Sequence, residues 1–252
     1  MNPRRCGEVF RQEFTHNLRR PLMWVLLVIL AFFAYMMSTG EAAIGSGNSA
    51  VGGTKAFVTS EFAIAQLLAM MASIIYAFFV AVAAGMSVIR DEEQKVGELL
   101  HATPLSPAEY VWGKFAATMA GFLALLAVHL GFMVLFNHGV PHGENVDVIG
   151  PFAWSSYLRP ALLFALPALL CMAGTSFALG TLTRLPILVF ALPLATIMLG
   201  ATLLWNWSPS WLSPAVNRLL MLLDPAGIRW LNETWLNEIG RASCREIVLR
   251  LV

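Results

Sequence analysis

The residues with the clearest capacity for chemistry are four carboxylates gathered in one short segment. Asp91, Glu92, Glu93 and Glu98 fall within eight positions, although the whole chain has only 15 acidic residues. Long apolar runs flank this segment on both sides. Carboxylates held between two apolar runs can present charge to a partner in water. We therefore interpret the segment as a docking surface; the alternative is a solvated connector whose charges only keep it out of the bilayer.

The sequence motifs that hold nucleotides or metals are absent. There is no GxxxxGKS or GxxxxGKT to hold the phosphates of ATP, no GxSxG and no HExxH. The three cysteines are far apart and form no metal-ligand spacing. His129 lies within an apolar run, where it either faces a substrate path or bonds to a neighbouring helix. We expect no catalytic residue, no metal site and no cofactor bound by this chain.

The composition is typical of a membrane protein. Hydrophobic residues make up 58% of the 252 residues and charged residues only 12%, whereas a soluble domain has about 25% charged residues. The net charge of +1 gives no reason to expect a nucleic acid as a partner. The predicted fold is an all-α polytopic transmembrane helix bundle. Spans need about 20 apolar residues and are expected at 21–38, 61–89, 107–136, 157–182 and 186–206.

Basic residues predict the orientation of these spans. Residues 1–20 carry five arginines and 90–106 carry two basic residues, whereas 39–60 carry one and 137–156 carry none. We therefore expect the N-terminus, the carboxylate segment and Arg184 on the cytoplasmic side of a bacterial inner membrane.

The first 20 residues predict a helix that lies in the membrane interface. Cys6, Phe10, Phe14 and Leu18 recur at every fourth position, with arginines around them. The apolar side would face lipid and the basic side anionic headgroups. Pro21 breaks the helix so that the chain can turn into the bilayer. The alternative is a basic flank that only fixes topology.

Helix start and stop residues bound the carboxylate segment. Val96, Leu99 and Leu100 have helical spacing, and the helix is expected to stop before Pro104. The pattern Ser-Pro-Ala-Glu at 106–109 then predicts a capping box that opens the third span. Ser-Pro at 213–214 predicts the start of another short helix.

Small residues recur at every fourth position within the spans, a spacing that lets helices approach closely. They are Ala77, Ala81 and Gly85, then Ala117 and Gly121, then Ser176 and Gly180. Pro167 and Pro193 are expected to kink the fourth and fifth spans.

Together these features resemble the permease subunits of type-2 ATP-binding-cassette (ABC) exporters. The resemblance rests on the elbow helix around 13–21, the Arg-Asp-Glu exit at 90–92, the segment 97–106 and Tyr-x-x-Gly-Lys-Phe at 110–115, and it covers about 8–236. It implies that a separate nucleotide-binding subunit, which holds ATP and magnesium, docks on a coupling helix after the second span. It also implies a second permease half and a sixth span that is not visible here.

The resemblance assigns two sets of residues to this transmission surface. The coupling helix would use Arg90, Asp91, Glu92, Glu93, Val96, Gly97, Glu98, Leu99, Leu100 and Thr103. The elbow helix would use Phe10, Glu13, Phe14, Leu18, Arg19 and Arg20. The expected function is the membrane permease component of an ATP-driven exporter. The alternative is a membrane-anchoring or assembly module without transport activity, for example the anchor of a fused peptidase-like domain.

The C-terminal part carries three further expectations. Residues 44–48, 62–66 and 223–227 look like those of permeases fused to a downstream aminopeptidase-like domain. Residues 207–237 are expected to form helices at the outer interface. Residues 238–252 resemble the translation of a sequencing-library adapter, and we expect this tail to be non-native.

Overall fold

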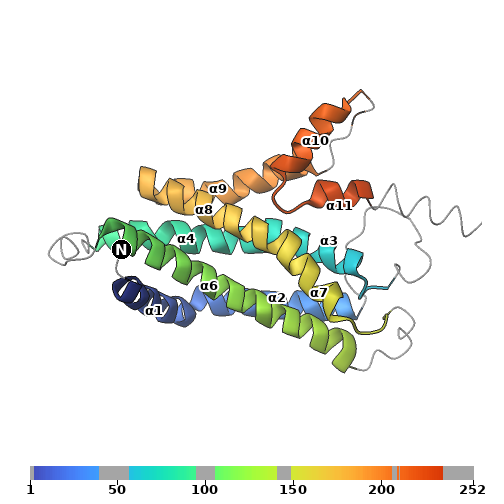
Figure 1. The fold of residues 1–252 in the computed structure, drawn as a ribbon, viewed down its shortest axis with the longest axis horizontal. Coiled ribbons are helices and arrows are strands. Elements are labelled where there is room, and N and C mark those ends of the chain that lie inside the picture. Colours follow the sequence, from blue (N-terminus) through green and yellow to red (C-terminus); the bar gives the residue numbers. More distant parts are fainter. Residues whose placement is uncertain are drawn as a thin grey trace, which may run out of the picture.

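The computed structural model describes residues 3–39, 57–94, 106–140, 149–205, 209 and 211–234. Within these ranges the chain forms helices and no strand, which confirms the predicted all-α bundle (Figure 1).

Five helical spans are long and apolar enough to cross a membrane, as predicted. Their helices are α2 (Pro21–Ser38), α3 (Glu61–Met71) with α4 (Ala77–Glu93), α6 (Pro107–Val134), α7 (Trp154–Pro160) with α8 (Leu166–Thr183), and α9 (Pro186–Leu199). Within the described ranges, the second to fifth spans each contain a π-helical turn, at Ala72–Tyr76, Leu135–Gly139, Ala161–Ala165 and Gly200–Leu204. The described ranges also contain three shorter helices: α1 (Pro3–Arg19), α10 (Pro214–Leu223) and α11 (Ile228–Thr234).

The two ends of the bundle differ. The helix α1, the end of α4, the start of α6 and the turn between α8 and α9 lie at one end, which we call the elbow end (left in Figure 1). The start of α3 lies at the opposite, far end, together with α7, α10 and α11. The elbow end therefore contains the arginine-rich helix α1 together with Arg90 and Arg184.

Helix caps set several of these boundaries. Ser106 Oγ accepts a hydrogen bond from the Glu109 N–H at 3.3 Å, and Glu109 Oε2 accepts one from the Ser106 N–H at 3.1 Å. This reciprocal pair is the predicted capping box. Ser213 caps α10 in the predicted place. The break between α1 and α2 falls at Arg20, directly before Pro21.

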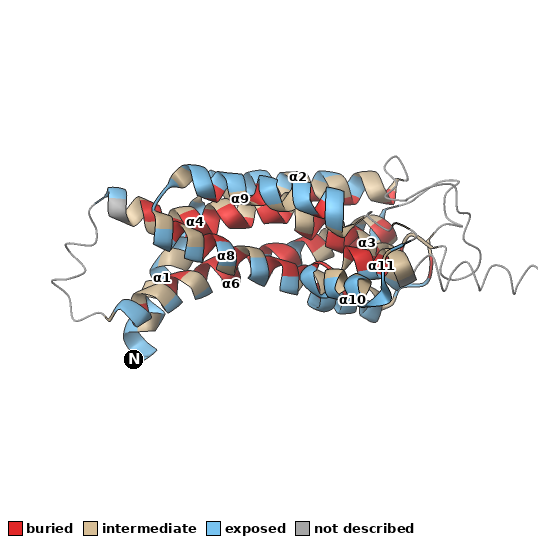
Figure 2. Ribbon diagram, turned by 90° about the horizontal axis from the view of Figure 1, so that it is seen from above, coloured by how far each residue is buried: buried red, intermediate tan, exposed pale blue. Residues whose placement is uncertain are grey.

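The second span forms the centre of the bundle. Of its most apolar stretch, 61% is buried, against 17% in the fifth span, and Figure 2 shows buried residues concentrated between the helices. Its closest neighbour is α8, where the Ser176 hydroxyl donates to the Ala81 carbonyl at 2.6 Å. A Cβ atom added at Gly180 would lie 2.6 Å from the Gly85 carbonyl oxygen. The small residues predicted on the second and fourth spans therefore pack against each other where α4 meets α8.

The second and fourth spans differ in detail from their expected form. The helix α4 continues to Glu93, four residues beyond the expected limit, because Asp91 is paired within the protein and can remain in the helix. The fourth span bends between α7 and α8 (Figure 1). The bend coincides with the π-helical turn Ala161–Ala165, which lies just before Pro167.

A buried polar network closes the far end. Arg229 is 2% exposed, and its Nε and Nη2 donate to Asn217 Oδ1 at 2.8 and 2.5 Å. Asn217 Nδ2 in turn donates to Glu233 Oε1 at 2.5 Å. The side chain of Arg229 also donates to the Leu204 carbonyl at 3.0 Å. These bonds join α10, α11 and the end of the fifth span, so α11 packs onto the protein at the far end.

Candidate functional site

A buried ammonium group connects three helices at the elbow end. Lys114 Nζ lies 2.6 Å from Glu13 Oε1 of α1 and 2.7 Å from Asp91 Oδ2 of α4. It also donates to the Ser87 carbonyl at 3.0 Å. The hydroxyl of Tyr110 donates to the same Asp91 carboxylate. We call Glu13, Asp91, Tyr110 and Lys114 the elbow cluster.

The charged side chains of the elbow cluster are largely buried, which strengthens the interactions between them. The side chains of Lys114, Glu13 and Asp91 are only 6%, 13% and 22% exposed. Charges in such a setting are poorly screened by water, so each depends on its partners. The Lys114 ammonium also lies 5.3 Å from the centre of the Tyr110 ring, within the range of a cation–π interaction. The cluster therefore holds α1, α4 and α6 in one fixed arrangement.

Close packing supports the same arrangement. A Cβ atom added at Gly113 would lie 2.8 Å from Val9 Cγ1, so only glycine allows α1 to approach α6 here. One turn beyond Glu13 and Lys114, Asn17 is 2% exposed and donates to Thr118 Oγ1 at 3.5 Å. The face of α1 that contacts the protein thus contains polar residues, Glu13 and Asn17 among them.

The predicted elbow residues occupy three different faces of α1. Glu13 belongs to the elbow cluster. Phe10 and Phe14 stack with their ring centres 5.7 Å apart, and Leu18 is 42% exposed, so an apolar stripe remains free to contact lipid. Arg19 is exposed, whereas Arg20 is half-buried at the junction with α2.

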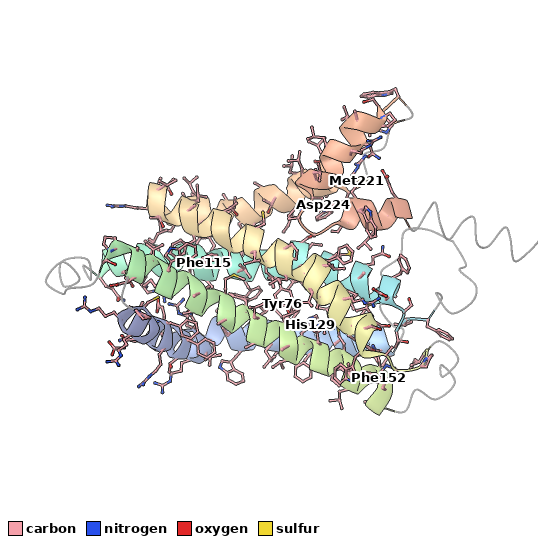
Figure 3. The ribbon with its side chains drawn as sticks, in the orientation of Figure 1. Tyr76, Phe115, His129, Phe152, Met221 and Asp224 are labelled. Atoms are coloured by element: carbon pink, nitrogen blue, oxygen red, sulfur yellow. The ribbon has the colours of Figure 1, made fainter. Side chains whose placement is uncertain are left out.

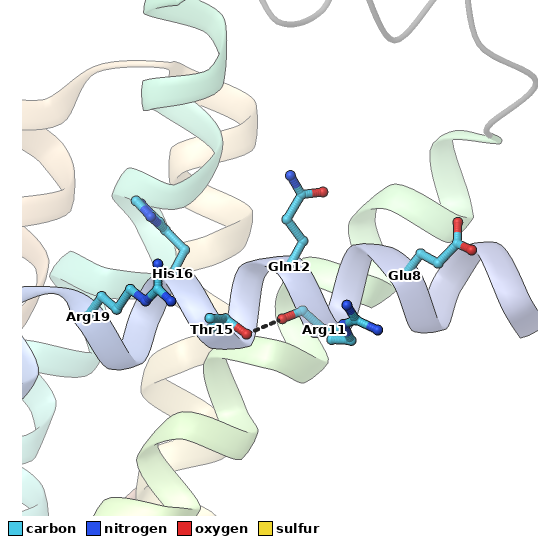
Figure 4. Close-up of a pocket in the computed structure, with 6 residues that line it drawn as sticks. All are labelled: Glu8, Arg11, Gln12, Thr15, His16 and Arg19. Carbon is cyan, nitrogen blue, oxygen red and sulfur yellow. Dashed lines mark hydrogen bonds between the residues drawn. The ribbon is translucent and has the colours of Figure 1, made fainter.

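The polar face of α1 forms a shallow pocket, shown in Figure 4. Its lining residues are Glu8, Arg11, Gln12, Thr15, His16 and Arg19. Thr15 Oγ1 donates to the Arg11 carbonyl at 2.8 Å. Partial burial lowers the pKa of His16, and the charge of Arg20 lowers it further. Burial and the nearby arginine therefore both disfavour protonation of His16.

The predicted coupling residues are only partly described. Arg90 and Asp91 lie in the last turn of α4, half-buried, and Glu93 is exposed. The side chain of Glu92 lies outside the described part of the chain. So do the other predicted contacts, which are Val96, Gly97, Glu98, Leu99, Leu100 and Thr103.

Sequence reasoning missed Lys114 as the central residue. The available signal was a lysine within an apolar span, which needs a nearby counter-ion. Tyr110 and Trp112 lie near the start of the third span, where aromatic residues commonly form a belt at the membrane interface. Trp112 is 58% exposed and fits that role, whereas the Tyr110 hydroxyl is bound to Asp91.

A second polar pair lies in the middle of the bundle. Tyr76 Oη and His129 Nδ1 are 3.2 Å apart, and both residues are buried (Figure 3). This is the helix-to-helix bond that was one of the two interpretations of His129. Within the described ranges, no group of three or more His, Cys, Asp or Glu residues could hold a metal ion. The Tyr76–His129 contact thus links the second and third spans in the middle of the bundle.

Comparison with known families agrees with this architecture. A family model described as an ABC-2 family transporter protein matches residues 51–222, more than half of the chain. The match includes α3 to α9 and most of α10, but not α1 and α2. No curated protein and no solved structure matches the chain significantly. With five membrane-spanning helices and this family match, the chain belongs to the ABC-2 transporter family as a multi-pass membrane permease subunit.

Proposed function

We propose that this permease exports its substrate with energy from ATP hydrolysed by a separate nucleotide-binding subunit. That subunit would dock at the elbow end, on the segment between α4 and α6. The elbow end would face the cytoplasm of a bacterial cell, as the distribution of basic residues indicates. The observation that carries the proposal is the elbow cluster, which joins both flanks of the docking segment to α1.

The cluster gives a physical route for coupling. Along the chain, the segment 95–105 links α4 to α6, and Asp91 and Lys114 lie in the parts of these two helices that flank the segment. A force on this segment acts on the end of α4 and on the start of α6 at the same time. Because Lys114 contacts Asp91 and Glu13, α1 would move with them as one unit. Sub-ångström shifts at such a packed junction are passed on because packed interiors resist deformation.

A second permease half would complete the transport path. The fifth span is the least buried of the five. Its exposed side chains include Ile187, Leu194 and Met198. This surface needs lipid or another permease half to cover it.

Co-purification of this permease with a candidate nucleotide-binding subunit tests the proposal. We would compare the wild type with Glu98→Arg and Leu99→Asp, and measure both binding and stimulation of ATP hydrolysis. Reversing a charge or inserting one at a docking surface should weaken binding by at least about tenfold. Glu144→Arg, the same charge reversal in the loop expected on the outer side, is the matched control. Equal binding and equal ATPase stimulation in all four proteins would refute the docking site and favour an anchoring role.

A further inference from the structure

Two arginine side chains at the elbow end lack a partner in the described part of the chain. Arg20 and Arg90 are both half-buried. The Nε atom of Arg20 is fully buried, and no described group accepts its hydrogen bond. The ion pairs among described residues include neither guanidinium. Buried charges in proteins are normally paired, because an unpaired one forfeits its hydration without compensation.

The described charged groups near Arg20 and Arg90 do not neutralise these two arginines. Burial lowers the pKa of Arg20, and the charge of Arg90 lowers it further. Glu13 and Asp91 act in the opposite direction, but both carboxylates are already bound to Lys114. The two carboxylates that act on Arg20 thus lie beside three positive charges, those of Lys114, Arg20 and Arg90. The helix α2 begins beside Arg20 without a side-chain cap, which adds the positive end of its dipole.

Exposed tryptophans place these arginines at the depth of lipid headgroups. Trp24, in the first turn of α2, is 60% exposed, and its Nε1 donates to the Leu18 carbonyl at 3.1 Å. Trp112, in the first turns of α6, is 58% exposed. Tryptophan collects at the membrane–water interface because its ring is apolar and its N–H is polar. The ligand available at this depth is the phosphate of a phospholipid.

We propose that Arg20 and Arg90 bind the phosphate group of an anionic phospholipid at the junction of α1, α2 and α4. A guanidinium suits this ligand because its planar N–H groups match two phosphate oxygens. A bound phosphate would offset the positive charge of the two guanidiniums and relieve the repulsion between them. The lipid would fix the angle between the interfacial helix and the first span. The site stands independently of ATP-driven export.

Native mass spectrometry of the full, delipidated chain tests this site by titration with phosphatidylglycerol and, separately, phosphatidylcholine. The wild type should bind phosphatidylglycerol more tightly. Charge-assisted hydrogen bonds are strong enough that Arg20→Gln/Arg90→Gln should weaken this binding by at least about tenfold. Arg11→Gln/Arg19→Gln is the control, because it removes two exposed charges from the same region; it should change the affinity by less than about threefold. Equal losses in the two double variants would overturn the proposal in favour of general basic attraction.

Two further arms separate the remaining explanations. Millimolar inorganic phosphate should leave phosphatidylglycerol bound; complete displacement would show that the site takes free phosphate and would overturn the lipid assignment. Arg90→Lys keeps the charge and should retain binding better than Arg90→Gln. Helix content and monodispersity are compared for every variant, and these single substitutions decide the case if the double variant fails to fold. Loss of binding in Arg90→Gln alone supports the site, and no loss contradicts it.

Discussion

Lys114 holds two carboxylates that come from helices on either side of it, Glu13 and Asp91. Lys114→Met would leave both carboxylates poorly hydrated and without their cation. Removing one partner from a buried ion pair reduces stability by about 3–5 kcal/mol. We expect a loss of that order in the free energy of unfolding, measured by SDS titration of the purified protein.

The far end supplies the control for this prediction. Arg159 and Glu61 form a pair at 3.9 Å whose side chains are 68% and 45% exposed. Arg159→Met should lower the stability by less than about 1 kcal/mol, because water screens exposed pairs. A triple variant, Lys114→Met with Glu13→Gln and Asp91→Asn, neutralises all three charges of the elbow cluster. It should lose less free energy of unfolding than Lys114→Met alone, because no unpaired buried charge remains. Similar losses for Lys114→Met and Arg159→Met would contradict the account.

His16 reports the positive potential around Arg20. Burial lowers its pKa first, and Arg20 is the next cause. Arg20→Gln should therefore raise the pKa of His16 toward 6.5 without fully restoring it, because the burial remains. An NMR titration of labelled histidine measures the change, with Arg159→Gln as a distant control. A pKa that stays the same or falls in Arg20→Gln would show that the two residues do not interact.

At the scale of elements, the contact between α4 and α8 depends on backbone approach. A Cβ at Gly180 would lie 2.6 Å from a carbonyl oxygen of α4, whereas nothing lies within 4 Å of a Cβ at Gly174 on the same helix. Gly180→Ala should lower stability by about 1–3 kcal/mol, the usual range for overpacking. Gly174→Ala should be neutral or slightly stabilising, because alanine is the better helix former. SDS unfolding compares the two variants, and equal effects would argue against close packing.

Local sequence patterns predicted many element boundaries and failed at contacts between elements. The capping box at 106–109 and the break at Pro21 depend on neighbouring residues, so the sequence contains all the information needed. Glu13 and Lys114 are separated by 101 positions, and no periodic pattern relates them. The same separation concealed the face of α1 that contacts the protein through Glu13 and Asn17, since an apolar repeat of four describes only the side expected to face lipid.

For the whole molecule, the number of spans followed from composition, because each apolar run has at least the roughly 17 residues that a membrane-spanning helix needs. The central position of the second span did not follow from it, since all five spans are similarly hydrophobic. The spans differ in how much of each is buried in the bundle. At the elbow cluster, close packing of helices is combined with buried ion pairs. We have proposed that the elbow end receives force from a nucleotide-binding subunit.

Site-specific photocrosslinking in intact membranes tests that claim most directly. A benzophenone amino acid would replace Leu99, in the predicted docking segment, or His142, in the loop expected on the opposite side. We predict a covalent adduct with the ATPase from position 99 and none from position 142. An adduct from position 142, or no adduct from position 99 in a complex that co-purifies, would contradict the account.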